Sequence, residues 1–169
     1  MTFIIIILLL SLVFIIGALV YFGNKNSRKQ KKAFSDEMQK IADKYSFSWD
    51  KVDLSRNRAL AWNSAQRIFL HGAWKENTPL LHLILMDDVQ HFELSETIVL
   101  ERDQDNKMTH RNVTELSLAF SFKDKAKSNQ SLGFYSEIID GVMERNNQTQ
   151  KAKEWLALMR NSVGSAQVQ

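Results

Sequence analysis

The stretch of sequence that decides the fold is Glu115-Leu116-Ser117-Leu118-Ala119-Phe120-Ser121-Phe122-Lys123. Every second residue from Leu116 to Phe122 is large and apolar, and the residues between them are small or polar. Because side chains of a strand point alternately to its two faces, this pattern predicts a half-buried antiparallel strand. One face of that strand contributes to a hydrophobic core.

Short runs rich in β-forming residues lie on both sides of this strand. They are Arg58–Trp62, Arg67–His71, Leu80–Met86, Val89–Leu94, Thr97–Glu101 and Leu132–Tyr135. Asn63-Ser64-Ala65 predicts a hairpin turn between the first two runs. A change of phase near Ser95-Glu96 predicts a bulge, and Asp103–Lys107 predicts a polar turn. The sequence therefore predicts about seven short antiparallel strands.

Amphipathic helices flank the predicted strands. On the N-terminal side, apolar residues recur at helical spacing at Phe34, Met38, Ile41, Ala42 and Tyr45. On the C-terminal side, the same kind of spacing is found at Ala152, Trp155, Leu156, Met159 and Val163. Asn147 or Thr149 can cap this second helix and Gly164 can end it. Ser136 can cap a short helix over Glu137–Glu144, which Gly141 weakens.

The N-terminal segment Phe3–Phe22 is almost entirely apolar. Its 20 residues, at a rise of about 1.5 Å each, match a bilayer core of roughly 30 Å, so we predict a transmembrane helix. A buried soluble helix and a cleaved signal peptide are the alternatives. The first would keep a polar stripe, and the second would have a basic start and a small-residue cleavage site.

Five basic residues follow this segment and none precedes it. They are Lys25, Arg28, Lys29, Lys31 and Lys32. The positive-inside rule then predicts a single-pass protein of the inner (plasma) membrane, with the N-terminus outside and the C-terminal domain in the cytoplasm. The same five residues are predicted to contact the membrane surface.

These features divide the chain into four predicted parts. They are a transmembrane anchor at 1–23, a basic linker with an amphipathic helix at 24–46, a β domain with a C-terminal helix at 47–164, and a disordered tail at 165–169. Beyond residue 32 the chain carries 17 basic and 19 acidic residues, so the domain itself is nearly neutral. That balance argues against a nucleic-acid-binding domain, which needs a basic face.

The stretch Leu83-Ile84-Leu85-Met86-Asp87-Asp88-Val89-Gln90-His91-Phe92-Glu93-Leu94 resembles a step in bacterial pleckstrin-homology-like domains. In those domains an apolar strand leads through Asp-Val or Asp-Ile into the next strand. The resemblance covers about residues 47–163 and implies an α+β fold: a small antiparallel β-barrel or sandwich with a C-terminal amphipathic helix. It implies no phosphoinositide site, because the first hairpin loop, Asn63–Gln66, has no basic residue.

Catalytic and metal-binding patterns are weak in this sequence. The chain has no cysteine, no phosphate-binding glycine loop and no H-E-x-x-H motif. The four histidines, His71, His82, His91 and His110, fall on different predicted strands and turns. Asp87-Asp88 suits a strand junction, and Asp103 with Asp105 lacks the rest of a calcium loop. We therefore expect no enzyme, no cofactor and no metal site.

Trp49, Trp62 and Trp74 lie in the first third of the predicted domain. They are candidates for a partner surface, since tryptophan is enriched at interfaces; core packing is the alternative. The predicted function is a membrane-anchored, non-enzymatic interaction module with an unknown protein partner. An anionic-lipid-binding domain is one alternative, and a subunit of a larger membrane assembly of the secretion, conjugation or phage-exclusion type is another.

Overall fold

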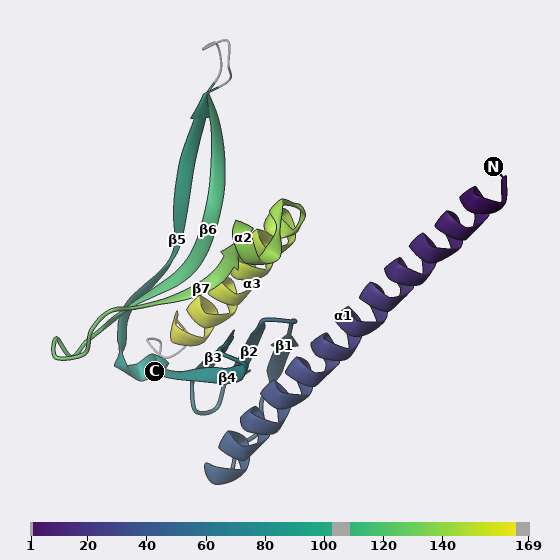
Figure 1. Cartoon of the computed structure of the whole chain (residues 1–169). Coiled ribbons are helices and arrows are strands. Elements are labelled where there is room, and N and C mark those ends of the chain that lie inside the picture. Colours follow the sequence, from purple (N-terminus) through teal and green to yellow (C-terminus); the bar gives the residue numbers. More distant parts are fainter. Residues whose placement is uncertain (1, 103–108, 165–169) are drawn as a thin grey trace. The chain divides into compact units, whose positions relative to one another are not determined.

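A computed structural model describes the backbone of residues 2–102 and 109–164, with side-chain surroundings for residues 12–18, 21–100 and 112–162. Over this range the protein is α+β, with two antiparallel sheets and a helix at its C-terminal end (Figure 1). The chain divides into two compact units, residues 1–83 and 84–169. The predicted turn at Asp103–Lys107 and the predicted tail at 165–169 lie outside the described residues.

The first unit begins with one continuous helix, α1, from Thr2 to Lys44. The segment from Asn24 to Lys32, which we expected to be a linker, belongs to this helix. Residues 24–44 contain neither glycine nor proline, so nothing in this stretch interrupts the helix. A Schellman motif ends it: the N–H of Phe47 donates to Ala42 O at 3.0 Å and that of Ser46 to Asp43 O at 3.3 Å.

The predicted membrane anchor at Phe3–Phe22 is contradicted. No helix within the described part of the chain is both long enough and apolar enough to cross a bilayer. The apolar run does not form a helix of its own, because α1 continues from it through the charged residues up to Lys44. The predicted location, a single-pass protein of the plasma membrane with a cytoplasmic domain, is corrected by the same finding.

The first sheet has the strand order β1-β2-β3-β4. Its strands are β1 Lys51–Leu54, β2 Arg58–Asn63, β3 Ile68–Lys75 and β4 Thr78–Leu85. The predicted hairpin is confirmed, with β2 and β3 antiparallel and Ala61 opposite Leu70. Glu76 and Asn77 both have positive φ, as a two-residue turn of the type I′ class requires, and they join β3 to β4. Pro79 is tolerated because β4 is an edge strand.

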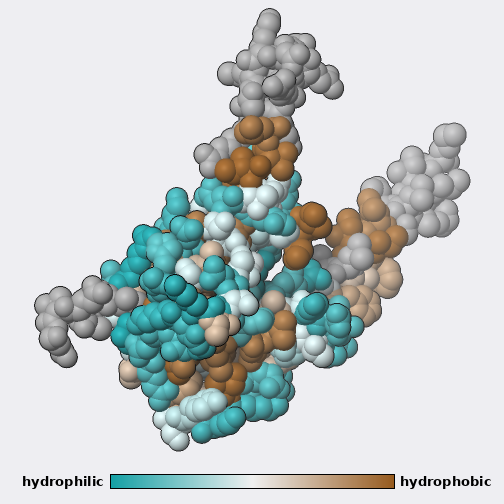
Figure 2. Space-filling model, turned by 90° about the vertical axis from the view of Figure 1, so that its left-hand side faces the viewer, coloured by the Kyte–Doolittle hydropathy of each residue, from teal (hydrophilic) through white to brown (hydrophobic). Residues whose placement is uncertain are grey.

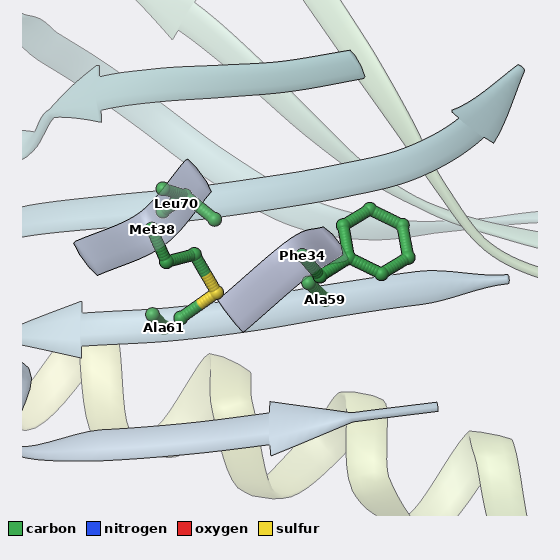
Figure 3. Close-up of a cluster of buried hydrophobic side chains, with 5 residues drawn as sticks. All are labelled: Phe34, Met38, Ala59, Ala61 and Leu70. Carbon is green, nitrogen blue, oxygen red and sulfur yellow. The ribbon is translucent and has the colours of Figure 1, made fainter. Parts of the chain in front are cut away.

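Helix α1 packs on one face of this sheet through a small buried cluster. The cluster consists of Phe34, Met38, Ala59, Ala61 and Leu70 (Figure 3). The two alanines let the helix come close to β2. Gly72 in β3 extends this close approach, since a Cβ there would lie 3.0 Å from both Phe34 Cε1 and Ala59 Cβ. The small residues in the strands therefore leave room for the large side chains of the helix to pack against the sheet.

The second unit consists of a three-stranded sheet and the C-terminal helices. A 3₁₀ turn, η1 at Met86–Asp88, leads into β5 Val89–Arg102, and β6 Thr109–Phe122 and β7 Gln130–Ser136 follow. Helix α2 Glu137–Asp140, the 3₁₀ turn η2 Val142–Glu144 and helix α3 Arg145–Gly164 complete it. The sheet order is β5-β6-β7. β6 pairs with β7 only from Glu115 to Phe120, so the outer end of the long β5–β6 hairpin is two-stranded (Figure 1).

The alternation in β6 is confirmed: Leu116, Leu118, Phe120 and Phe122 are all buried. Phe120 stacks on Phe92, its partner across the strand pair, at a centroid distance of 6.2 Å. Helix α3 contacts all three strands of this sheet, and its apolar positions Ala152, Trp155, Leu156 and Met159 are buried. The helix begins at Arg145, earlier than either predicted cap.

Two features differ from the predicted β domain. The seven described strands form two separate sheets that are not closed into a barrel. The predicted interruption of β5 near Ser95-Glu96 is a shift of register between Thr97 and Ile98 inside a single 14-residue strand. A bulge bends a strand without ending it, which is why the sequence suggested two strands.

Candidate protein-docking site

A cluster of large apolar side chains is exposed between β7 and α3. Ile138 and Met143 are 95% and 96% exposed, and Ile139 and Val142 are 62% and 51% exposed. We call these four residues the apolar patch. Single exposed apolar residues are ordinary on protein surfaces, whereas a contiguous group indicates an interaction site.

The backbone of the patch is held in place by hydrogen bonds. The N–H of Ser136 donates to Asp140 Oδ2 at 2.9 Å, and the N–H of Gly141 donates to Glu137 O at 2.9 Å. The hydroxyl of Tyr135, a buried residue, donates to Gly141 O at 3.3 Å. The patch is therefore a fixed surface feature of the second unit.

Gly141 explains why these apolar residues are not folded into the core. Its φ of 80° lies in a region that L-residues with a Cβ rarely adopt, and it ends α2 after one turn. A single turn cannot present a continuous apolar stripe to a sheet. No residue of α2 or η2 is buried.

A cavity lies beside the patch. Its volume is about 450 Å³, and its lining includes Thr114 and Glu115 from β6, Ser136, and Ile138 and Val142 from the patch itself. The Nδ2 of Asn112 in β6 donates to Glu137 Oε2 at 3.3 Å and ties α2 to the strand at this place. The patch thus combines protruding side chains with a hollow into which a partner side chain can insert.

The charges in and next to the patch are mostly negative. From Ser136 to Glu144 the chain has three carboxylates, on Glu137, Asp140 and Glu144, and Arg145 follows directly. Glu115, which lines the cavity, adds a fourth. The electrostatic potential at the rim of the patch therefore favours a cationic partner.

A second exposed apolar surface lies at the outer end of the β5–β6 hairpin, where Figure 2 shows brown surface. Val99 and Leu100 are 45% and 67% exposed there. These side chains lie on β5 and do not line the cavity beside the patch. They provide a natural comparison for the patch.

The five predicted basic residues lie in the middle of α1 and are all exposed. At 100° per residue, Lys25, Arg28, Lys29 and Lys32 share one face of the helix, and Lys31 points away from it. That face is opposite the one that carries Phe34 and Met38 to the sheet. We call these four residues the basic face.

Two of the predicted partner-surface tryptophans pack against the cluster under α1. Trp49 donates from Nε1 to Met38 O at 3.1 Å and contacts the Phe47 ring edge-on at 4.7 Å. Trp74 contacts the Phe34 ring edge-on at 5.7 Å. Both are partly buried, so only part of each ring remains for a partner.

The third predicted tryptophan, Trp62, is 1% exposed. It lies in β2 opposite Phe69 of β3. The structure therefore does not gather the three tryptophans into one exposed surface.

The histidines whose surroundings the structure describes, His71, His82 and His91, do not form a metal-binding cluster. His71 is buried in β3, and His91 Nε2 in β5 lies 3.5 Å from Glu93 Oε2. Among the residues that the structure describes, no three histidine or carboxylate side chains come close enough together to hold a metal ion.

Comparisons with protein-family models, with curated proteins and with solved structures gave no match to this chain.

The patch was not singled out from the sequence. The sequence predicts only that Ile138-Ile139 and Val142-Met143 lie in a short helix over Glu137–Glu144. The available signal was Gly141 between the two apolar pairs, which leaves each pair on less than two turns of helix. The spacing of these residues, two i, i+4 pairs, suits one face of a helix, but Gly141 divides the segment into α2 and η2, so no continuous helix buries that face.

Proposed function

We propose that this protein is a non-enzymatic interaction module that docks a protein partner on the apolar patch. The observation that supports the proposal most directly is the 95% and 96% exposure of Ile138 and Met143 on a hydrogen-bonded backbone. Large apolar side chains held outward in this way are typical anchors of protein interfaces.

The size of the patch sets the strength expected of such an interaction. Full burial of a fully exposed large apolar side chain contributes about 1.5–3 kcal/mol; because Ile139 and Val142 are already partly buried, the four together contribute less than roughly 6–12 kcal/mol. Association costs on the order of 4–15 kcal/mol in lost freedom of motion. The patch alone therefore supports a weak interaction, and a stable one needs further contacts at its rim.

A site-specific crosslinking experiment tests the proposal. A photo-crosslinking amino acid replaces Met143 in the full chain, and in a matched control it replaces Leu100, which is exposed and apolar but distant in sequence. Crosslinking is carried out in the native cell. We expect discrete adducts from position 143 and few from position 100.

A second variant links these adducts to the patch. Ile138→Asp places a charge among the apolar side chains and should abolish the adduct formed from position 143. Because Ile138 is 95% exposed, we expect the thermal unfolding of this variant to match that of the unmodified chain. Equal adduct yields at positions 143 and 100, or adducts that persist with Ile138→Asp, would refute the proposal.

The resemblance to pleckstrin-homology-like domains remains part of the proposal as a statement about fold family. The order of elements supports it, with seven described antiparallel strands ahead of α3. The open sheets count against it. The proposal takes no ligand from that family, because one fold supports many functions.

A further inference from the structure

We propose that the apolar patch docks on the basic face of α1 in a second copy of this chain. This inference rests on the proposed function and names its partner. The observation that leads to it is the match between an apolar surface with an acidic rim and a basic helix face with exposed aromatic residues at its start.

The acidic side of this match is the rim of the patch. Glu137, Asp140 and Glu144 lie in the same segment as the four apolar side chains, and Glu115 lines the cavity beside them. Each of the first three accepts a local hydrogen bond: Glu137 Oε2 from Asn112 Nδ2 at 3.3 Å, Asp140 Oδ2 from the N–H of Ser136 at 2.9 Å and Glu144 Oε2 from Asn147 Nδ2 at 3.0 Å. A carboxylate has about four acceptor sites, so one such bond does not use its full capacity.

The basic side is the helix face formed by Lys25, Arg28, Lys29 and Lys32. No acidic residue precedes Asp36, which lies one turn after Lys32, so this part of α1 carries an excess of positive charge. Tyr21 and Phe22 are 64% and 61% exposed and contact each other edge-on at 5.7 Å, directly before the basic face. A shallow pocket beside Tyr21 and Lys25 could accept a side chain of the partner.

The apolar patch and the basic face are complementary. The patch needs contacts at its rim in addition to apolar burial, and the basic face offers four cations next to two aromatic rings. Tyrosine and arginine are also the residue types most enriched among the strong contacts of interfaces. Charge pairing of this kind selects the partner and speeds encounter, and salt weakens it.

A second copy satisfies this match in a self-complementary way. Every copy carries one patch and one basic face, so this chain by itself supplies both sides of the contact.

A charge-exchange experiment on the full chain tests this inference. One variant carries Glu115→Lys and Glu144→Lys, and the other carries Lys25→Glu and Lys29→Glu. A control variant, Lys153→Glu with Arg160→Glu, reverses two exposed charges on α3. Sedimentation velocity measures self-association of each protein, and of mixtures, over a range of concentrations up to about 100 µM, where weak dimers are detected.

For each of the two test variants alone we expect the dimer Kd to be at least about 10-fold higher than that of the unmodified chain. A 10-fold change in Kd corresponds to about 1.4 kcal/mol. An equimolar mixture of the two should regain dimers, because each patch then meets a helix of opposite charge. The control variant should behave like the unmodified chain. Association through the exposed apolar residues at positions 12–16 would be indifferent to these charge reversals.

Crosslinking between isotopically distinct copies separates this inference from the proposed function. Unlabelled chain with the photo-crosslinker at position 143 is mixed with ¹⁵N-labelled chain, and mixed-label adducts should map to residues 21–32. A monomer at all concentrations, a mixture that stays monomeric, or adducts of one label only would overturn the second-copy partner. Adducts to a different protein in the native cell would still support the docking function, whereas the absence of any adduct from position 143, to another copy or to a different protein, would remove both.

Discussion

Gly72→Ala tests how α1 is seated on the first sheet. A Cβ at this position would lie 2.8 Å from Leu81 Cδ2, 3.0 Å from Ala59 Cβ and 3.0 Å from Phe34 Cε1. Leu81 Cδ2 is the end of a flexible side chain and can move aside. Phe34 is fully buried, and its ring contacts Trp74, so it cannot move without disturbing the cluster.

The expected cost follows from this geometry. Adding one carbon to a well-packed core costs about 1–3 kcal/mol, and we expect Gly72→Ala to destabilise the first unit by this amount. For a unit of this size, 1 kcal/mol corresponds to a fall in melting temperature of roughly 4–8 °C. Urea denaturation followed by tryptophan fluorescence gives the free energy of unfolding directly.

Two matched variants make the result specific. Gly133→Ala adds the same methyl group in β7, where no atom lies within 4 Å, and should leave stability unchanged or slightly raised. Ala59→Gly removes the methyl group directly opposite Gly72 in the strand pair. The double variant, Ala59→Gly with Gly72→Ala, should lose less unfolding free energy than the sum of the losses of the two single variants. If Gly72→Ala unfolds at the same urea concentration as the unmodified chain, the close approach of α1 is not as described.

Three further changes probe the first unit. Ser46→Gly should raise the free energy of unfolding by about 0.5–1 kcal/mol, because Ser46 caps α1 with a φ of 55° that glycine adopts without strain; a thermal melt checks it. Met38→Ala should lower it by about 2–5 kcal/mol, because Met38 is 2% exposed in the cluster, and unchanged urea unfolding would contradict this packing. Asp50→Asn tests the hydrogen bonds that Asp50 Oδ2 accepts from the hydroxyl and the N–H of Ser64 at 2.5 and 2.6 Å, which hold the pKa of Asp50 below its ordinary 3.8. This stabilisation is present above pH 3.8 and is lost as the pH falls through the lowered pKa, so the small difference from the unmodified chain should be seen at pH 7 and vanish in strong acid.

Local periodicity predicted most of the elements and little of their assembly. The alternation from Leu116 to Phe122 and the helical spacing around Trp155 both describe one face of one element, and both are confirmed as buried faces. Neither pattern states which elements share a sheet. The division into a four-stranded and a three-stranded sheet depends on pairing between residues far apart in sequence, which single-sequence periodicity does not contain.

The continuous helix α1 shows where composition misleads. The change from apolar to polar residues near Asn24 suggested a boundary between two structures. Helix formation depends on backbone preferences, and lysine, glutamine and arginine are good helix formers, so the polar stretch continues the helix. Composition changed there and backbone conformation did not.

The patch and the two buried cores consist of different residues, so substitutions can test the docking proposal and the packing separately. Phe34 and Met38 are buried in the core beneath α1, and Trp155 is buried in the core beneath α3. Each of these side chains is 2% exposed or less. Ile138 and Met143 contribute to neither core, since removing them changes almost no buried area. Substitutions in the cores should therefore change stability, and substitutions in the patch should change association while the unfolding curve stays where it is. A patch variant that shifted both would mean that Ile138 and Met143 are buried in the folded protein, and the docking surface would then have to be sought elsewhere.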